Sequence, residues 1–243
     1  MVRENKTQGV ALVTGGAKRI GKAICLSLSS SGYKIALHYH KSGAQAKNVA
    51  KTIRQRGGIC ELFPCDLSDY SQAATLIPNV LKKFSQLNVL VNNASIFEPS
   101  TISNTRLASL NDHFAVNFKT PYILTAAFAS KCKKGHIINI LDTHITDNRT
   151  AHAAYLLSKK ALCELTKLSA VELAPHIRVN GIAPGLIFAP ERAKPGYLEK
   201  LTGKVPLKKK GDVGQITQTI EFLMNNPYVT GQIIFNDGGE HLI

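Results

Sequence analysis

The stretch Val10–Gly21 reads V-A-L-V-T-G-G-A-K-R-I-G, an apolar run followed by a glycine-rich turn and a helical pattern. Gly15 permits the tight turn, and Gly21 lets the following helix approach the strand closely. The first turn of such a helix presents unpaired N–H groups and a partial positive charge, which favour a pyrophosphate. The stretch therefore predicts a strand, a phosphate-binding loop and a helix, although the same residues could form only a turn.

Outward from this stretch, short apolar runs alternate with segments of helical periodicity. The runs predict strands at Val10–Thr14, Lys34–Tyr39, Ile59–Pro64, Val89–Asn92, His136–Ile140, Arg178–Ile182 and Gln232–Phe235. The predicted helices include Gly21–Ser31, Ala44–Arg56, Tyr70–Phe84 and Ala153–Leu173. Nearly continuous apolar strands joined by helices favour a parallel sheet covered on both faces. We predict an α/β fold, a Rossmann-type doubly wound parallel sheet of about seven strands in a three-layer α/β/α arrangement.

The length of 243 residues fits a single domain over residues 1–243. The net charge of +14 favours anionic ligands, which could be nucleotides, nucleic acid or a membrane surface. The five cysteines are odd in number and form no C-x-x-C pair, so we predict reduced thiols in a cytoplasmic protein and no disulfide or zinc framework. No apolar stretch predicts a signal peptide or a transmembrane helix.

The stretch Pro184–Gly214, rich in proline, glycine and lysine, is the one long segment without a regular pattern. It follows a predicted strand, and ligands of open parallel sheets bind beyond the carboxyl ends of the strands. We interpret residues 184–214 as a substrate loop that covers the site. The alternative is a surface insertion.

The region around the second predicted strand lacks acidic residues, which bears on the cofactor. Between Asn5 and Cys60 the chain has no Asp or Glu but has ten Lys or Arg residues. An NAD site usually carries an acid near the end of the second strand, whereas here that end reads His38-Tyr39-His40-Lys41-Ser42. A 2′-phosphate would be attracted by Lys18, Lys41 and His40. We therefore predict NADPH in preference to NADH. The alternative is that these lysines only form a solvated basic face.

Tyr155 and Lys159 form a Y-x-x-x-K pair within the predicted helix Ala153–Leu173. Residues four apart lie on one face of a helix, so the lysine could lower the pKa of the tyrosine through its positive charge. Tyr155 would then be a usable proton donor to a substrate that is being reduced. The motif alone also occurs by chance, so its meaning depends on its neighbours.

Several motifs together resemble the short-chain dehydrogenase/reductase family over nearly the whole chain. They are the T-G-x-x-x-x-x-G loop at 14–21, Asp66-Leu67, Asn92-Asn93-Ala94, Asn117, the Tyr155 and Lys159 pair, and Pro184-Gly185 after a strand. The resemblance implies an oxidoreductase with a nicotinamide cofactor.

Two positions depart from the usual pattern of this family. Arg19 stands where the loop usually has another glycine, and Asp142 stands 13 residues before Tyr155, where the family usually has a serine. A serine would orient a ketone oxygen, whereas an ionised aspartate would repel the oxygen that gains charge as a carbonyl is reduced. A carboxylate can accept N–H bonds or deliver a proton through Tyr155 or water. Asp142 therefore favours a nitrogenous substrate with a C=N bond.

Both departures resemble the pteridine reductase branch, as do T-G-G-A-K-R-I-G at 14–21, His38–Ser42, Asn92–Phe97 and Pro184–Leu186. The resemblance implies NADPH-dependent reduction of a dihydropterin (dihydrobiopterin, dihydromonapterin or dihydrofolate) to the tetrahydro form by a homotetramer. It implies that Phe97 stacks on the pterin and that Lys159 holds the nicotinamide ribose.

The resemblance also implies three sets of site residues. The catalytic set, in which Asn117 supports a proton-relay water, is Asn117, Asp142, Tyr155 and Lys159. The cofactor set is Gly15, Lys18, Arg19, Ile20, Gly21, His38, Tyr39, His40, Lys41, Ser42, Asp66, Leu67, Asn93, Ala94, Ser95, Tyr155, Lys159, Pro184, Gly185 and Leu186. The substrate set is Arg19, Ser95, Phe97, Asp142, Tyr155 and Leu186. No metal site is predicted, because His38 and His40 have no third ligand nearby.

Other interpretations stay open. A 3-oxoacyl-carrier-protein or other carbonyl reductase of the same family would suit the basic surface, although Asp142 argues against it. A non-catalytic NADPH-binding or nucleic-acid-binding protein is a further alternative, against which the intact catalytic set argues. At the level of single residues, Asp142 could be a helix cap, Phe97 a core aromatic and Arg19 a surface residue.

Overall fold

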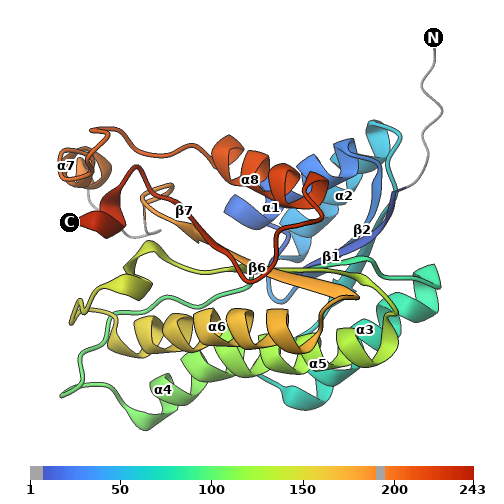
Figure 1. The fold of residues 1–243 in the computed structure, drawn as a ribbon, viewed down its shortest axis with the longest axis horizontal. Helices are drawn as coiled ribbons and strands as arrows, with labels where there is room; N and C mark the ends of the chain where they lie inside the picture. The colour runs from blue at the N-terminus through green and yellow to red at the C-terminus, as the bar shows by residue number, and fades with distance from the viewer. Residues whose placement is uncertain (1–7, 190–194) are drawn as a thin grey trace.

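Figure 1 shows the computed structural model of the chain, which describes residues 8–189 and 195–243. Within these residues, seven strands form one sheet in the order β3-β2-β1-β4-β5-β6-β7, and all neighbouring strands are parallel. The strands are β1 (Gly9–Val13), β2 (Tyr33–Tyr39), β3 (Cys60–Pro64), β4 (Val89–Asn92), β5 (Gly135–Ile140), β6 (Ile177–Pro184) and β7 (Ile233–Asn236). The predicted Rossmann-type fold is confirmed, with each predicted strand end within two residues of its place.

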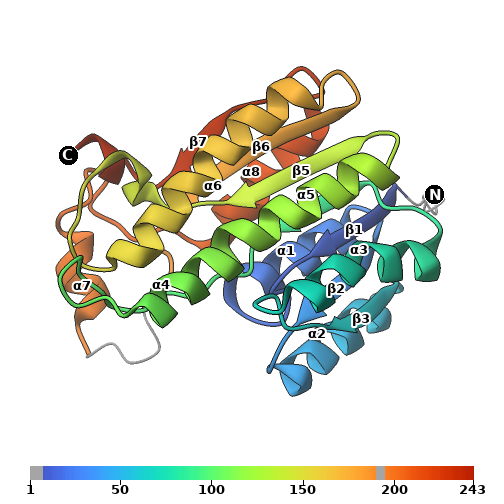
Figure 2. The same cartoon turned by 90° about the horizontal axis from the view of Figure 1, so that it is seen from below.

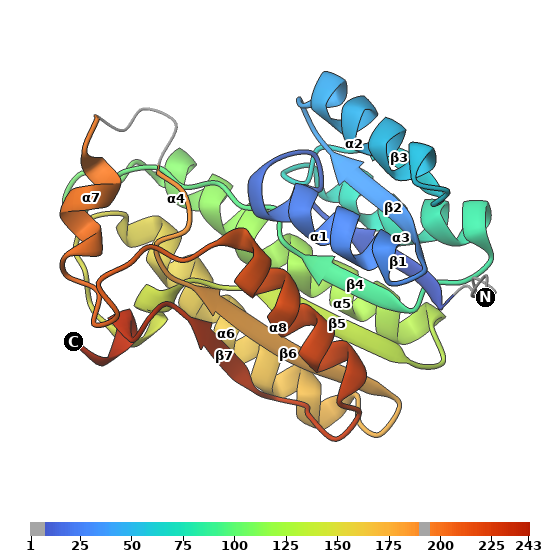
Figure 3. The same cartoon turned by 90° about the horizontal axis from the view of Figure 1, so that it is seen from above.

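Helices cover both faces of this sheet and give the predicted three layers. One face carries α1 (Arg19–Ser30), α2 (Gly43–Gln55) and α8 (Val213–Asn225), which lie in front of the sheet in Figure 3. The other carries α3 (Tyr70–Phe84), α5 (Thr120–Lys131) and α6 (Ala153–Glu172), in front of the sheet in Figure 2. The remaining elements are α4 (Leu107–Phe114), η1 (Ala115–Lys119), η2 (Thr143–Thr146), α7 (Tyr197–Thr202) and η3 (Glu240–Leu242).

The uninterrupted apolar pattern of β1 follows from this double cover. Val10 and Leu12 enter the core formed with α3 and α5, whereas Ala11 and Val13 enter the core formed with α1, α2 and α8. All four side chains are fully buried. Because successive side chains of a strand point to opposite faces, a strand covered on both faces must be apolar at every position.

The strand order reverses beside β1, and this places the functional site. The chain runs from β1 outward to β2 and β3, and then returns to β4 on the other side of β1. In open parallel sheets, ligands bind in the crevice beyond the carboxyl ends of the strands at such a reversal. The phosphate-binding loop predicted after β1 lies at that point.

The segment predicted to be irregular, Pro184–Gly214, is more ordered than expected. It contains α7, and α8 begins at Val213, before the predicted end of the segment. A helix as short as α7 is too brief for its periodicity to stand out in a sequence rich in glycine and lysine. The two ends of the segment are joined where the N–H of Gly211 donates to the carbonyl oxygen of Leu186 at 2.9 Å. Residues 190–194 of the predicted substrate loop lie outside the described residues.

Among the described helices, none has both the length and the apolar composition needed to cross a membrane. The five cysteines are buried free thiols. Among the described residues, no group of three His, Cys, Asp or Glu side chains is placed to hold a metal ion.

Candidate active site

A cleft of about 550 Å³ opens beyond the carboxyl ends of β1, β4 and β5. Most of the predicted site residues line it, from the phosphate-binding loop at one end to Asp142 and Tyr155 at the other. Lys41, Leu186 and Asn117, although described, are not among the lining residues. The lining also includes residues that sequence analysis missed, among them Ile187 and Phe188.

The phosphate-binding loop has the geometry that an anion requires. Gly15 has a φ of +63°, and a Cβ on Gly21 would clash with the carbonyl oxygen of Gly15. Helix α1 begins after Lys18, whose side chain makes no capping hydrogen bond, and its first turn has no acidic residue. Unpaired N–H groups at a helix start, with space that only glycine leaves, fit a pyrophosphate.

The side chain of His38 holds this loop in place through hydrogen bonds. The N–H of Gly15 donates to His38 Nδ1 at 3.0 Å, and His38 Nε2 lies 3.0 Å from the carbonyl oxygen of Cys65. Burial lowers the pKa of His38 to about 4, so the ring is neutral at pH 7. With Nδ1 as acceptor and Nε2 as donor, His38 ties the loop to the ends of β2 and β3.

The end of β2 carries less positive charge than its sequence predicts. His40 Nε2 lies 3.5 Å from Asp66 Oδ2, an acid that arrives from the end of β3. Hydrogen bonds from the hydroxyl and N–H of Ser68 to Asp66 lower the pKa of its carboxyl group, which stays ionised. The end of β2 has no acidic residue of its own, but Asp66 from the end of β3 places a carboxylate beside His40. Lys18, Arg19 and His40 are basic residues that line the cleft near the phosphate-binding loop.

At the other end of the cleft, Tyr155 and Asp142 form a hydrogen-bonded pair. The Tyr155 hydroxyl donates to Asp142 Oδ2 at 2.7 Å, and the N–H of His144 donates to Asp142 Oδ1 at 2.9 Å. Asp142 is thus both the N-cap of η2 and the partner of Tyr155. The helix-cap alternative for Asp142 is therefore correct, and the same side chain also contacts Tyr155.

The pKa of Tyr155 is shifted upward, whereas the spacing of Tyr155 and Lys159 led us to expect a lowered pKa. Burial and the neighbouring Asp142 carboxylate raise the pKa of Tyr155 well above its usual value. Lys159 Nζ lies 5.7 Å from the centre of the Tyr155 ring and donates to the carbonyl oxygen of Ile140 at 2.8 Å. Burial lowers the pKa of Lys159 to about 8. The tyrosine hydroxyl consequently stays protonated at neutral pH.

The segment after β4 is held in place by Thr14 and Asn117. Thr14 Oγ1 accepts the N–H groups of Asn93 and Ala94 at 2.9 and 3.0 Å. The buried Asn117 side chain accepts from the N–H of Ile96 at 2.9 Å and donates to the Ile96 carbonyl oxygen at 3.1 Å. Its amide also donates to Ser158 Oγ at 3.0 Å. Asn117, in the π-helical turn η1, therefore connects this segment to the helix that carries Tyr155.

Phe97 and Arg19 project into the cleft and are neither core nor isolated surface residues. The Phe97 side chain is 47% exposed, and its ring lies edge to face with Tyr155 at 4.7 Å. Arg19 Nη2 donates to the carbonyl oxygen of Ala189 at 2.9 Å, and its guanidinium lies 5.0 Å from the centre of the Phe188 ring. Arg19 thereby joins the phosphate-binding loop to the predicted substrate loop. In the sequence, the apolar pair Ile187 and Phe188 after Gly185 could have indicated that the substrate loop lines the cleft.

Comparison with known proteins identifies relatives of this chain. Residues 9–195 match the family model described as short chain dehydrogenase. Pteridine reductase 1 of Leishmania tarentolae is 30% identical over 97% of both chains. A 3-oxoacyl-[acyl-carrier-protein] reductase of Synechocystis is 32% identical over 96% of this chain and 97% of its own. The crystal structure of FolM alternative dihydrofolate reductase 1 from Brucella canis, complexed with NADP, has a TM-score of 0.93 and 34% identity over 98% of this chain and 95% of its own.

Proposed function

Because the chain belongs to the short-chain dehydrogenase family, we propose that this oxidoreductase uses NADPH to reduce a dihydropterin or dihydrofolate to the tetrahydro form. The contact of the Tyr155 hydroxyl with Asp142 at 2.7 Å, beside the exposed ring of Phe97, carries this proposal. A carboxylate at this position disfavours an incipient alkoxide and suits a ring that presents N–H groups. The similarity to a pteridine reductase and to a FolM dihydrofolate reductase supports the same substrate class.

The cofactor assignment is supported by the fit of the cleft to a dinucleotide. The first turn of α1, with Gly15 and Gly21, would hold the pyrophosphate, and Lys159 the nicotinamide ribose. Lys18 and His40 would attract a 2′-phosphate, and the FolM relative was crystallised with NADP. When bound, NADPH supplies the hydride for the reaction.

Reduction of a C=N bond adds a hydride to carbon and a proton to nitrogen. We assign the proton to the Tyr155 hydroxyl, which its raised pKa keeps loaded at neutral pH. Phe97 stacks on the flat substrate ring, while Asp142 accepts hydrogen bonds from its N–H groups and relays a proton from solvent back to Tyr155. Lys159, largely charged at pH 7 with a pKa of about 8, opposes the negative charge that develops on the tyrosine oxygen.

A second candidate is the reduction of a 3-oxoacyl thioester. It is favoured by the carrier-protein reductase of Synechocystis, whose identity to this chain equals that of the pteridine reductase within a few per cent. Asp142 argues against it for the electrostatic reason given above.

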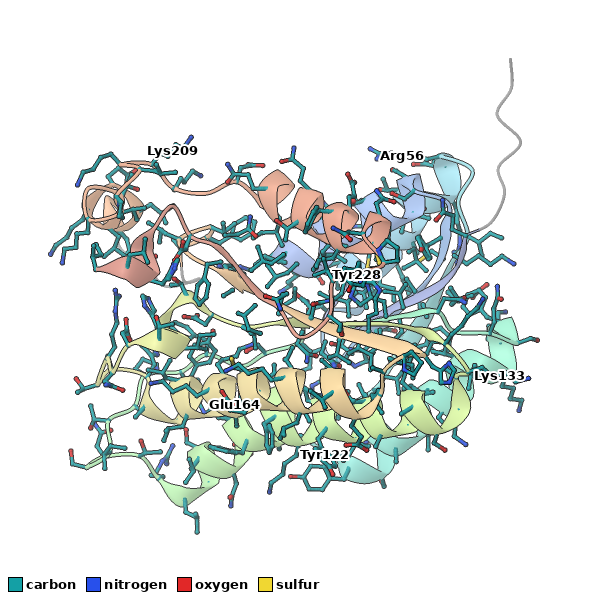
Figure 4. All side chains as sticks on the ribbon, in the orientation of Figure 1. Arg56, Tyr122, Lys133, Glu164, Lys209 and Tyr228 are labelled. Carbon is teal, nitrogen blue, oxygen red and sulfur yellow. The ribbon has the colours of Figure 1, made fainter. Side chains whose placement is uncertain are left out.

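We further assign the active form as a cytoplasmic homotetramer. The outer surfaces of α5 and α6 expose apolar side chains that a neighbouring copy could cover, namely Tyr122, Leu168 and Val171. Figure 4 shows Tyr122 pointing away from the sheet, below α5. Sedimentation of the purified protein tests the tetramer, and a monomer or dimer at micromolar concentration would contradict it.

The decisive experiment measures NADPH oxidation with dihydrobiopterin, dihydromonapterin, dihydrofolate and an acetoacetyl thioester. We expect turnover of the pterins and not of the thioester. The Asp142→Ser variant should lose pterin turnover and gain thioester turnover, because a hydroxyl replaces the carboxylate. Turnover of the thioester alone by the unmodified protein would overturn the proposal.

A further inference from the structure

The imidazole of His152 covers one face of the Phe97 ring. The two ring centres are 4.0 Å apart and the planes are inclined by 15°, so the rings are stacked. Phe97 lines the cleft, whereas His152 is not among the lining residues. The imidazole therefore covers one face of Phe97, the Tyr155 ring approaches Phe97 edge to face at 4.7 Å, and the Phe97 side chain stays 47% exposed.

The backbone and side chain of His152 both point to a specialised position. Its φ of +64° lies in the left-handed region, which side chains other than glycine seldom adopt. Its Nδ1 is buried and has no hydrogen-bond partner among the described residues. Since the side chain makes no hydrogen bond within residues 8–189 and 195–243, the stack with Phe97 is the contact that orients the ring.

The segment from Phe97 to Ser100 also contacts the start of α6, the helix that carries Tyr155. His152 is the N-cap of α6 but makes no side-chain capping bond. Ser100 does so instead, because its carbonyl oxygen accepts the N–H of Ala153 at 2.9 Å and its hydroxyl accepts the N–H of Ala154 at 3.1 Å. The chain from Phe97 to Ser100 is thus fixed at both of its ends to the first turn of α6.

We propose that His152 is a positioning residue for substrate binding, which holds the Phe97 ring at the angle at which a flat heterocycle stacks on the face opposite the imidazole. This inference rests on the proposed function and deepens it: the binding site is a three-layer stack of imidazole, phenyl ring and substrate ring. Ser100 sets the distance between this stack and the Tyr155 hydroxyl. A thioester without a ring would gain nothing from the arrangement.

Two variants of His152 separate stacking from folding. His152→Asn keeps a residue that tolerates the left-handed backbone but removes the ring. We expect it to raise KM for the dihydropterin about two- to tenfold, the range of a lost aromatic stack, with kcat, KM for NADPH and Tm nearly unchanged. His152→Phe keeps a flat ring on a strained backbone, so Tm should fall while KM for the dihydropterin stays close to that of the unmodified protein.

The opposite pattern would overturn the inference. If KM followed Tm across the two variants, His152 would have only a structural role. A second measurement needs no turnover: the imidazole proton resonances of His152 should be shifted by the Phe97 ring current and should move in Phe97→Leu. Resonances that do not move refute the stack even in an active pterin reductase. Absence of pterin turnover in the unmodified protein instead refutes the proposed function, and the resonances then decide whether the stack itself exists.

Discussion

Asp142 directs its two carboxylate oxygens to two different elements. One oxygen accepts the N–H of His144 and so caps η2, and the other accepts a hydrogen bond from the Tyr155 hydroxyl of α6. A serine hydroxyl at this position could make one of these contacts but would carry no negative charge. The identity of this one residue therefore changes which charge the cleft tolerates next to the transferred proton.

At Tyr155, the hydroxyl can be removed without changing the ring. We expect Tyr155→Phe to lower kcat by a factor of about 10² to 10⁴, the usual contribution of a positioned proton donor. The affinity for NADPH, measured by fluorescence titration, should change little because the phosphate-binding loop is untouched. Unaltered kcat in this variant would remove Tyr155 from the mechanism.

The lowered pKa of His38 predicts that the free energy of unfolding decreases in mild acid. Its pKa is about 4 in the folded chain and about 6.5 when unfolded. Between these values the unfolded state binds more protons, so the free energy of unfolding should decrease as the pH falls from 6.5 to 4, by up to roughly 3 kcal/mol. Urea unfolding across this range measures the slope. His38→Gln should be less stable at pH 7 and show a shallower slope, whereas an equal slope would place the titration elsewhere.

At the scale of elements, the helices begin in two different ways. Asp69 caps α3 by accepting the N–H groups of Ser71 and Gln72, and Asp212 forms a capping box at the start of α8. Helix α1, whose first turn faces the cleft, begins at Lys18 without such a side-chain bond. A side-chain cap would occupy the N–H groups that a bound phosphate needs.

This difference can be tested by giving α1 a cap. Lys18→Asn and Lys18→Ala remove the same charge, but only asparagine can accept the N–H groups of the first turn. We expect Lys18→Asn to be more stable than Lys18→Ala by about 1 kcal/mol without cofactor. The Lys18→Asn variant should also bind NADPH more weakly, with a higher Kd in fluorescence titration than Lys18→Ala. Equal Kd values would mean that the N–H groups of α1 do not hold the phosphates.

At the scale of the whole molecule, the cleft gathers residues from both halves of the sheet. The phosphate-binding loop follows β1, Asp66 follows β3, and the Tyr155 pair lies beyond β5 on the other side of the strand reversal. A ligand that spans the cleft therefore binds only the folded arrangement and stabilises it by mass action. With a net charge of +14, the whole chain also attracts anions over a long range.

We expect NADPH to raise the free energy of unfolding by about 2.7 kcal/mol at one hundred times its Kd. At equal concentration, NADH should raise Tm less, since it lacks the 2′-phosphate. The difference should narrow as salt is added, because ions screen exposed charges. A larger shift with NADH would mean that Asp66, close to His40, sets the cofactor preference instead of Lys18 and His40.

The sequence by itself determined the alternation of strands and helices, the buried strands and the shared face of Tyr155 and Lys159, because these depend on periods of a few residues along the chain. The tertiary structure alone decided that Asp66 approaches His40, that Arg19 reaches Ala189 and that His152 stacks on Phe97. It also decided the direction of the pKa of Tyr155, because a neighbouring lysine can be read from spacing, whereas burial of the ring and the approach of Asp142 arise only when distant elements pack.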